Sequence, residues 1–203
     1  MIRNIIFDMG NVLVGFDSIR IAAQFASDPA DQQLLLDAIF FHSDWKRLDA
    51  GEITDADIYA AIPERLPPRL VQAGIDAFTH WPQYRSRIPE AEPLVDDVKA
   101  AGYRTYLLSN ASKRWDAYWR EVPEMVKLDG HIVSGKVGLV KPDPAIYHLL
   151  CKTYALNPAE CYLIDDLPAN VAAAHDIGMD GFSLTHFQFD ELRTDMRAKG
   201  IRI

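Results

Sequence analysis

The feature that most constrains the fold is a short apolar run that ends in an acid, Ile5-Ile6-Phe7-Asp8. A strand that is covered on both faces of a parallel sheet reads as a continuous apolar run of this kind. In open α/β sheets, ligands bind just beyond the carboxyl ends of the strands. The run therefore predicts a central strand with Asp8 at the ligand-binding edge, where Gly10 would let the backbone turn sharply. An acid that only ends a strand and accepts hydrogen bonds in a turn fits this stretch equally well.

From residue 88 onward, expected helices alternate with expected strands. Apolar residues at helical spacing predict helices at 89–101, 112–120 and 144–154, another that ends at 177 and a last one that ends at 199. Short apolar runs predict strands at 103–108, 131–133, 161–164 and 181–184. Strands that alternate with helices indicate a parallel sheet with helices on both faces.

The strand pattern is absent between residues 17 and 87. Apolar residues recur at helical spacing in 31–41 and 69–78, and Thr54 with Asp57 resembles a capping box that begins another helix. The sequence therefore predicts a helical insertion placed directly after the first strand.

The composition narrows the classes of function. The chain has 203 residues and a formal net charge of −8 at pH 7, which argues against a nucleic-acid-binding surface because phosphate backbones require a basic face. We find no signal peptide and no apolar run of transmembrane length. Cys151 and Cys161 show no CxxC spacing and need no disulfide. We therefore expect a cytoplasmic protein of one domain, with at most a modest insertion, whose partners include neither nucleic acid nor a membrane.

Chemically useful side chains follow several of the predicted strands. Asp8 follows the first strand, Ser109-Asn110 the second and Asp165-Asp166 a later one, and Lys141 stands just before a helix start. Parallel strands bring such residues to one edge of the sheet. The set contains acids, a hydroxyl, an amide and a lysine but no histidine or cysteine. It therefore suits a hard cation and a phosphoryl group rather than zinc.

Four motifs in this order resemble those of the haloacid dehalogenase-like hydrolases. They are FDMGN at 7–11, LLSN at 107–110, Lys141 within KPDP, and LIDD at 163–166. The Gly-Asn pair after Asp8 is most similar to a branch that includes bacterial α-glucose-1-phosphate phosphatases. The phosphatase domain of soluble epoxide hydrolases is a more distant likeness.

The resemblance implies a fold, a domain organisation and an activity. The fold is α/β, with a Rossmann-like parallel sheet core at 1–16 and 88–203 and a small all-helical cap at 17–87. The activity is Mg²⁺-dependent hydrolysis of a phosphomonoester, through an aspartyl-phosphate intermediate of the kind that carboxylates form. The substrate is a small phosphorylated metabolite, with sugar phosphates among the candidates.

The resemblance also implies roles for individual residues. Asp8 would be the nucleophile, and Mg²⁺ would be held by Asp8, the Gly10 carbonyl and Asp166. Asp165 would support this site. The phosphoryl oxygens would be bound by Ser109, Asn110 and Lys141, and Lys141 would also balance the charge on the nucleophile.

One position departs from the pattern of most phosphatases in this family. A second aspartate two residues after the nucleophile usually serves as general acid and base, and this chain has Gly10 there. Candidates for a replacement are Asp17, His42, Asp44 and Lys46. Without a replacement, we expect a preference for leaving groups that are already acidic, because proton donation matters most for basic ones.

Two other functions remain open at this stage. A metal-independent 2-haloacid dehalogenase is one, because dehalogenases of this superfamily also lack the second aspartate. However, Asp165-Asp166 supplies more acid than a metal-free site would want. The other is a catalytically weak relative that binds a phosphorylated ligand or a protein partner.

Overall fold

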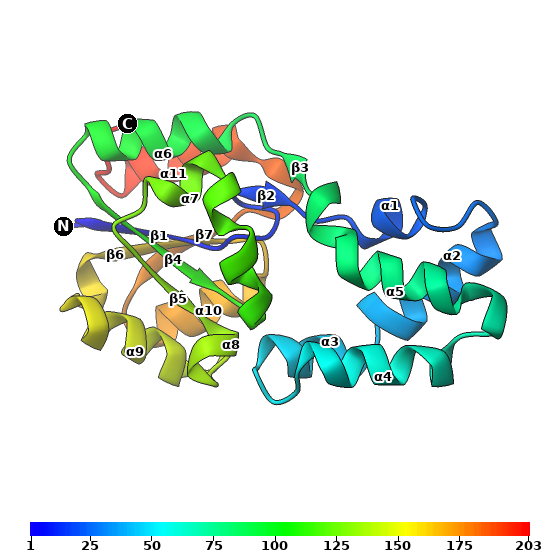
Figure 1. Ribbon diagram of the computed structural model, residues 1–203. Coiled ribbons are helices and arrows are strands. Elements are labelled where there is room, and N and C mark those ends of the chain that lie inside the picture. Colours follow the sequence, from blue (N-terminus) through cyan, green and yellow to red (C-terminus); the bar gives the residue numbers. More distant parts are fainter.

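The computed structural model describes residues 1–203 and has a five-stranded parallel sheet at its centre (Figure 1). The strands are β1 (Asn4–Phe7), β4 (Arg104–Ser109), β5 (Gly130–Val133), β6 (Cys161–Asp165) and β7 (Asp180–Ser183), in the spatial order β5-β4-β1-β6-β7. Ile6 of β1 pairs with Tyr106 on one side and with Leu163 on the other. The predicted α/β fold with a Rossmann-like parallel sheet is confirmed, and the first apolar run is its central strand.

Helices cover both faces of this sheet. On one face lie α6 (Ala91–Ala100) and α11 (Phe189–Ala198), and on the other α9 (Pro144–Tyr154) and α10 (Pro168–Asp176) (Figure 1). Two further helices, α7 (Pro123–Val126) and α8 (Ser134–Val137), are about one turn long. Ile5 and Phe7 pack in the layer of α6 and α11, whereas Ile6 packs in the layer of α9 and α10. Side chains alternate across a strand, so both faces of β1 are apolar because both are covered.

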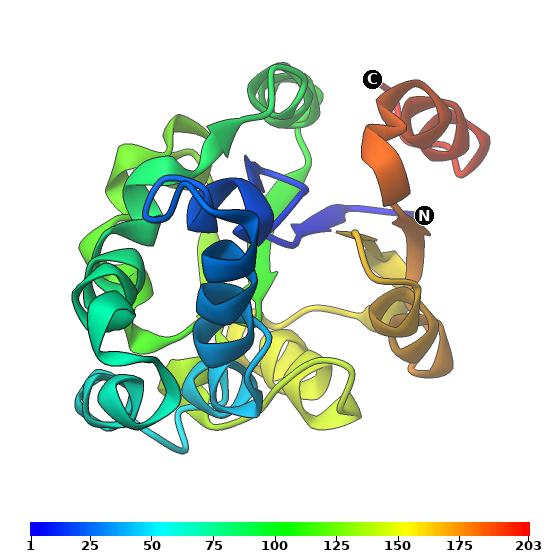
Figure 2. The same cartoon turned by 90° about the vertical axis from the view of Figure 1, so that its right-hand side faces the viewer.

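The inserted helical region (residues 18–84) lies beyond the carboxyl ends of the strands. Its helices are α1 (Ser18–Ala22), α2 (Pro29–Leu35), α3 (Ser43–Asp49), α4 (Asp55–Arg65) and α5 (Val71–His80). Figure 2, viewed from the side of these helices, shows them in front of the sheet, with α11 (red) away from them. No helix of the chain has the combined length and apolar character that a membrane crossing requires.

A short antiparallel ladder joins the inserted helical region to the sheet. It consists of β2 (Val14–Gly15) and β3 (Ser86–Arg87), with Val14 paired to Arg87. Sequence reasoning missed this ladder because two residues per strand leave no periodic pattern. The apolar cluster of the α6 and α11 layer continues into the inserted region, where it includes Ile21, Leu35 and Phe78. The division into a core and a cap at 17–87 stays a prediction.

Two predicted helices differ from the observed structure. The expected helix at 112–120 is wrong, because this segment forms two 3-10 turns, Lys113–Ala117 and Trp119–Glu121. Tyr118 separates them with a φ of −134°, and its buried ring packs against Trp81 at 5.7 Å between ring centroids. A tertiary contact therefore overrides the local helical pattern. The expected helix at 31–41 is regular only to Leu35 and continues as a π-helical turn.

Candidate active site

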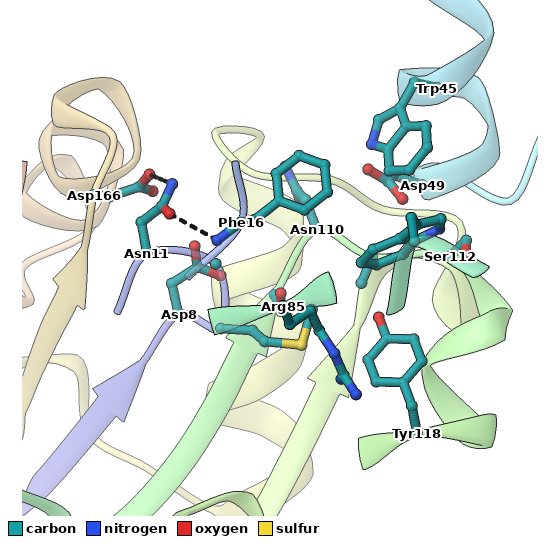
Figure 3. A pocket seen from close by; sticks show the side chains of 15 residues that line it. Asp8, Asn11, Phe16, Trp45, Asp49, Arg85, Asn110, Ser112, Tyr118 and Asp166 are labelled. Atoms are coloured by element: carbon teal, nitrogen blue, oxygen red, sulfur yellow. Dashed lines mark hydrogen bonds between the residues drawn. The ribbon is translucent and has the colours of Figure 1, made fainter. Parts of the chain in front are cut away.

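The carboxyl ends of β4, β1 and β6 meet at one cavity of about 190 Å³, which Figure 3 shows from close by. Since β1 lies between the other two strands, Asp8 sits between the residues that follow them. The lining residues from the ends and following loops of these strands are Asp8, Met9, Gly10, Asn11, Ser109, Asn110, Ala111, Ser112, Tyr118 and Asp166. Those from the inserted helical region and its junctions are Phe16, Trp45, Asp49, Trp81 and Arg85. The cavity therefore lies where the sheet faces the inserted helices.

Lys141 lies behind Asp8 and is the cationic member of a buried ion-pair network. Its Nζ is 2.9 Å from Asp8 Oδ1 and 2.6 Å from Asp165 Oδ2, and it donates to the Leu108 carbonyl at 2.6 Å. Burial disfavours the charge on Lys141, but the two carboxylates outweigh burial and raise the pKa of this amine. Lys141 therefore stays protonated, and it reaches the cavity only through Asp8, since it is not part of the wall.

Asn110 fixes the backbone of Lys141. Its side-chain Nδ2 donates to the Lys141 carbonyl at 2.9 Å, and the Lys141 N–H donates to Asn110 Oδ1 at 2.8 Å. The Asn110 side chain thus positions the lysine and has both its groups occupied. Ser109, which is 1% exposed, lines the cavity beside it. A direct contact of Ser109, Asn110 or Lys141 with a substrate stays a prediction.

Three carboxylates gather in this region, and their ligand atoms lie within 4.8 Å of one another. Both oxygens of the fully buried Asp165 are occupied, Oδ2 by Lys141 and Oδ1 by the Leu167 N–H at 3.0 Å and by Asn170 Nδ2 at 2.8 Å. Asp8 and Asp166, in contrast, both line the cavity. We call Asp8, Lys141, Asp165 and Asp166 the acid–lysine cluster.

The electrostatics of the acid–lysine cluster favour an added cation. Burial raises the pKa of Asp8 to about 6, although Lys141 opposes this shift. Burial also raises the pKa of Asp166, although the hydrogen bond from Asn11 opposes it. Three carboxylates with one lysine leave an excess of negative charge in a poorly solvated place. A divalent cation with oxygen ligands, such as Mg²⁺, fits this donor set, which contains no nitrogen or sulfur ligand.

Asn11 connects the loop after β1 to the end of β6. It has a φ of 54°, a left-handed conformation in which Asn is enriched among non-glycine residues. Its Nδ2 donates to Asp166 Oδ2 at 3.0 Å, and its Oδ1 accepts from the Phe16 N–H at 3.1 Å (Figure 3). Sequence reasoning noted the Gly-Asn pair but assigned Asn11 no role. Its place directly after Gly10 in a tight turn was the available signal.

The opposite side of the cavity is aromatic. Four rings follow one another in contact, with centroid distances of 5.8 Å for Phe16 to Trp45, 5.5 Å for Trp45 to Trp81 and 5.7 Å for Trp81 to Tyr118. We call these four residues the aromatic wall. The Arg85 guanidinium, which also lines the cavity, stacks on the Tyr118 ring at 4.1 Å from its centroid.

The family is shown by direct comparison. The model of the haloacid dehalogenase-like hydrolases matches residues 2–178. The chain belongs to this family.

Two phosphatases are similar to the chain over most of its length. It is 28% identical over 197 residues to the sesquiterpene phosphatase astK of Aspergillus oryzae, covering 96% of this chain and 93% of the relative. It is 23% identical over 191 residues to D-ribitol-5-phosphate phosphatase of Bacteroides thetaiotaomicron, covering 90% and 91% of the two chains. Two further relatives are much longer, and the chain spans 17% and 33% of their lengths.

The fold of this haloacid dehalogenase-like hydrolase is also found among solved structures. One is the family enzyme bt-2542 from Bacteroides thetaiotaomicron, crystallised as an aspartate-to-alanine mutant in complex with magnesium and inorganic phosphate. The TM-score is 0.71 at 20% sequence identity, and the alignment covers 90% of this chain and 94% of that one. At this identity the likeness shows the shared fold.

The structure brings most of the predicted site residues of this family member together but not the predicted replacement acids. Asp17, His42, Asp44 and Lys46 do not line the cavity. The His42 ring accepts the Asp44 N–H at 3.2 Å and so caps α3, while the Asp44 carboxylate is paired with Arg65 and Arg47. The acid of the inserted helical region that does line the cavity is Asp49. Sequence reasoning missed Asp49 because it missed α3, although Trp45 and Asp49, four residues apart, share one face of a helix.

Proposed function

We propose that this protein is a Mg²⁺-dependent phosphomonoester hydrolase that acts on a small phosphorylated metabolite, with sugar phosphates among the candidates. The observation that carries the proposal is the acid–lysine cluster, in which three carboxylates and one lysine meet beneath a small cavity. The two full-length phosphatase relatives, at 28% and 23% identity, support the same reaction class. The magnesium and phosphate in the complex of bt-2542 support the cofactor.

The metal would be held by Asp8, the Gly10 carbonyl and Asp166. Bound there, it would offset the negative charge of the nucleophile and of the phosphoryl group. Asp165 would support the metal site without binding the metal directly, because both of its oxygens already accept hydrogen bonds within the protein.

Asp8 is the proposed nucleophile. Lys141 pairs with Oδ1, which leaves Oδ2 as the oxygen that attacks phosphorus. The new bond joins Oδ2 to phosphorus, the ester bond breaks, and its electron pair leaves with the alcohol oxygen. The product is an aspartyl phosphate, which water then hydrolyses to regenerate Asp8. The Lys141 charge favours both the ionised carboxylate and the departing phosphate.

The aromatic wall supports a substrate class for the leaving group. Phe16, Trp45, Trp81 and Tyr118 present ring faces and edges rather than charges. Such surfaces stack on sugar rings and on apolar or aromatic groups. The cavity is small, at about 190 Å³, which suits a small leaving group.

The reaction is tested by measuring what the purified protein releases. We expect phosphate from 4-nitrophenyl phosphate and from members of a sugar phosphate panel with Mg²⁺, and none after chelation with EDTA. Halide release from 2-chloropropionate should be absent under both conditions. Halide release without metal, with no phosphate release, would instead identify a dehalogenase. Binding of phosphorylated ligands without any turnover would identify the weak binding relative.

The fate of oxygen from water separates the two enzymes independently. In a single turnover in H₂¹⁸O, water attacks the phosphorus of an aspartyl phosphate, so the label should enter phosphate and leave Asp8 unlabelled. An alkyl ester of Asp8, as a dehalogenase would form, is hydrolysed at the carboxyl carbon. Mass spectrometry that finds ¹⁸O in the peptide containing Asp8 would therefore contradict the proposal.

A further inference from the structure

The proposed phosphatase reaction needs a proton whose source has not been named. The inference below rests on that reaction. When the ester bond breaks, the departing alcohol oxygen needs a proton unless it is a weak base. Gly10 has no side chain to supply one. Besides the acid–lysine cluster, the titratable or charged groups of the cavity wall are Asp49, Arg85 and Tyr118.

Asp49 enters the cavity from the last turn of α3, across from Asp8 (Figure 3). The hydroxyl of Ser134 in α8 donates to the Asp49 carbonyl at 2.5 Å and accepts from the Ala111 N–H at 2.9 Å. One serine therefore ties Asp49 to the loop that follows β4. This loop carries Ser112, another residue of the cavity wall.

A close approach of two backbones fixes the end of α3 further. Gly51 has a φ of 73°, and a Cβ on it would lie 2.6 Å from the Gly135 carbonyl oxygen. A Cβ on Gly135 would in turn lie 2.9 Å from the Ala111 oxygen. Only glycines allow this contact, so three backbone segments are held against one another. Asp49 is thus positioned by the fold and does not depend on a mobile loop.

The surroundings of Asp49 favour its protonated form near neutral pH. Burial raises the pKa of Asp49 to about 7, and the charge of Asp8 adds to this effect, although the Ser112 N–H opposes it. The two other candidates are less suitable. Arg85 remains protonated at neutral pH, although burial lowers its pKa. Burial raises the pKa of Tyr118 far above neutral, so that Tyr118 would be slow to release a proton.

We propose that Asp49 is the general acid and base of the phosphatase reaction and replaces the acid that is absent at Gly10. In the first step Asp8 Oδ2 bonds to phosphorus, the ester bond breaks, and the Asp49 proton moves to the departing oxygen. The products are an alcohol, an aspartyl phosphate and an ionised Asp49. In the second step Asp49 takes a proton from water while the water oxygen bonds to phosphorus. The bond from phosphorus to Asp8 breaks, its electrons return to the carboxylate, and phosphate leaves.

The test compares two esters with rings of similar size but different leaving groups. Cyclohexyl phosphate releases a basic alkoxide, whereas 4-nitrophenyl phosphate releases a weakly basic phenolate. For Asp49→Asn we expect kcat/KM to fall by about 10²–10⁴-fold with cyclohexyl phosphate, the range of a general acid. With 4-nitrophenyl phosphate kcat/KM should fall by less than about tenfold. The kcat for this ester should drop, because the second step loses its base, and a burst of nitrophenol should precede the steady state.

Two further variants separate Asp49 from its surroundings. Asp28→Asn makes the same chemical change at an exposed helix start of the inserted helical region and should change neither ester's kinetics. Tyr118→Phe should keep the ratio of the two kcat/KM values.

The pH dependence provides a second test of Asp49. In the wild type, kcat/KM for cyclohexyl phosphate should decline above about pH 7, because the acid must be protonated, and Asp49→Asn should lack this decline. The ¹³C resonance of the Asp49 carboxyl group should titrate near pH 7 in the metal-free protein.

The possible results test the role of Asp49 separately from the proposed phosphatase function on which it rests. Equal losses for both esters in Asp49→Asn, without a burst, would assign Asp49 a structural role and overturn the inference alone. A selective loss for cyclohexyl phosphate in Tyr118→Phe, and not in Asp49→Asn, would transfer the role to Tyr118. A wild-type protein that releases no phosphate from either ester would overturn the proposed function and this inference together.

Discussion

The two sides of the cavity are built by different means. In the acid–lysine cluster, most side-chain polar atoms have a fixed partner, such as Asp165 with Lys141 and Asn170. In the aromatic wall, the rings contact one another, and Trp81 Nε1 is buried without a hydrogen-bond partner. Hydrogen bonds between buried charges impose strict geometry, whereas ring packing tolerates change in shape. We therefore expect the cluster to set the chemistry and the wall to select the leaving group.

The largest effect is expected from the nucleophile. Asp8→Asn should lower kcat by about 10⁴- to 10⁶-fold, as the loss of an essential nucleophile does in other hydrolases. Trp45→Phe, on the opposite side of the cavity, keeps an aromatic ring and should change kcat by less than about tenfold. Initial rates with 4-nitrophenyl phosphate at saturating Mg²⁺ measure both. If Asp8→Asn kept more than about a hundredth of the wild-type rate, another residue would be the nucleophile.

The next largest effect is expected on the free energy of unfolding when Lys141 is replaced. Lys141→Met leaves Asp8 and Asp165 buried without their cation, and breaking a buried ion pair from one side costs about 3–5 kcal/mol. Lys199→Met removes the lysine of an exposed pair with Asp180, whose Nζ to Oδ1 distance is 2.8 Å, and should cost less than about 1 kcal/mol. Urea unfolding of the metal-free proteins compares the two. If the two variants lost similar amounts of unfolding free energy, the acid–lysine cluster would be better solvated than its burial indicates.

A third prediction tests whether an acid at Gly10, on one side of the cavity, can replace Asp49 on the other. A Cβ on Gly10 would meet no atom within 4 Å, so the backbone leaves room to begin a side chain where other phosphatases of the family carry their acid. In the Asp49→Asn background, Gly10→Asp should restore about 10²-fold of kcat/KM for cyclohexyl phosphate. It should change kcat/KM for 4-nitrophenyl phosphate much less. Equal gains for both esters would show that the new side chain acts on the metal or the fold instead.

The smallest effect distinguishes two neighbouring acids. Asp166→Asn should weaken Mg²⁺ binding by about 100-fold and Asp165→Asn by about tenfold, because only Asp166 faces the cavity. Calorimetric titration with Mg²⁺ measures both, and circular dichroism checks that each variant is folded. The reverse order would place Asp165 in direct contact with the metal.

The central strand and the acid at its end can be predicted from the amino-acid sequence alone. The run Ile5-Ile6-Phe7 is apolar because both of its faces are covered, and a parallel sheet delivers strand ends to one edge. The strand pattern therefore suffices to group Asp8, Ser109 and Asp166. Lys141 was grouped with them from its place just before a helix start, and the resemblance to a family added the role of this lysine.

The other side of the cavity is defined by tertiary packing. Periodicity reports which face of an element is buried, and says nothing of contacts between segments that lie far apart in the chain. Ser134 binds the Asp49 carbonyl across 85 residues, and Tyr118 leaves the helical conformation where its ring packs on Trp81. The chemistry of the site lies in short motifs beside strands and is visible locally. The placement of Asp49 and the aromatic wall depends on long-range packing, which becomes defined only when the chain folds.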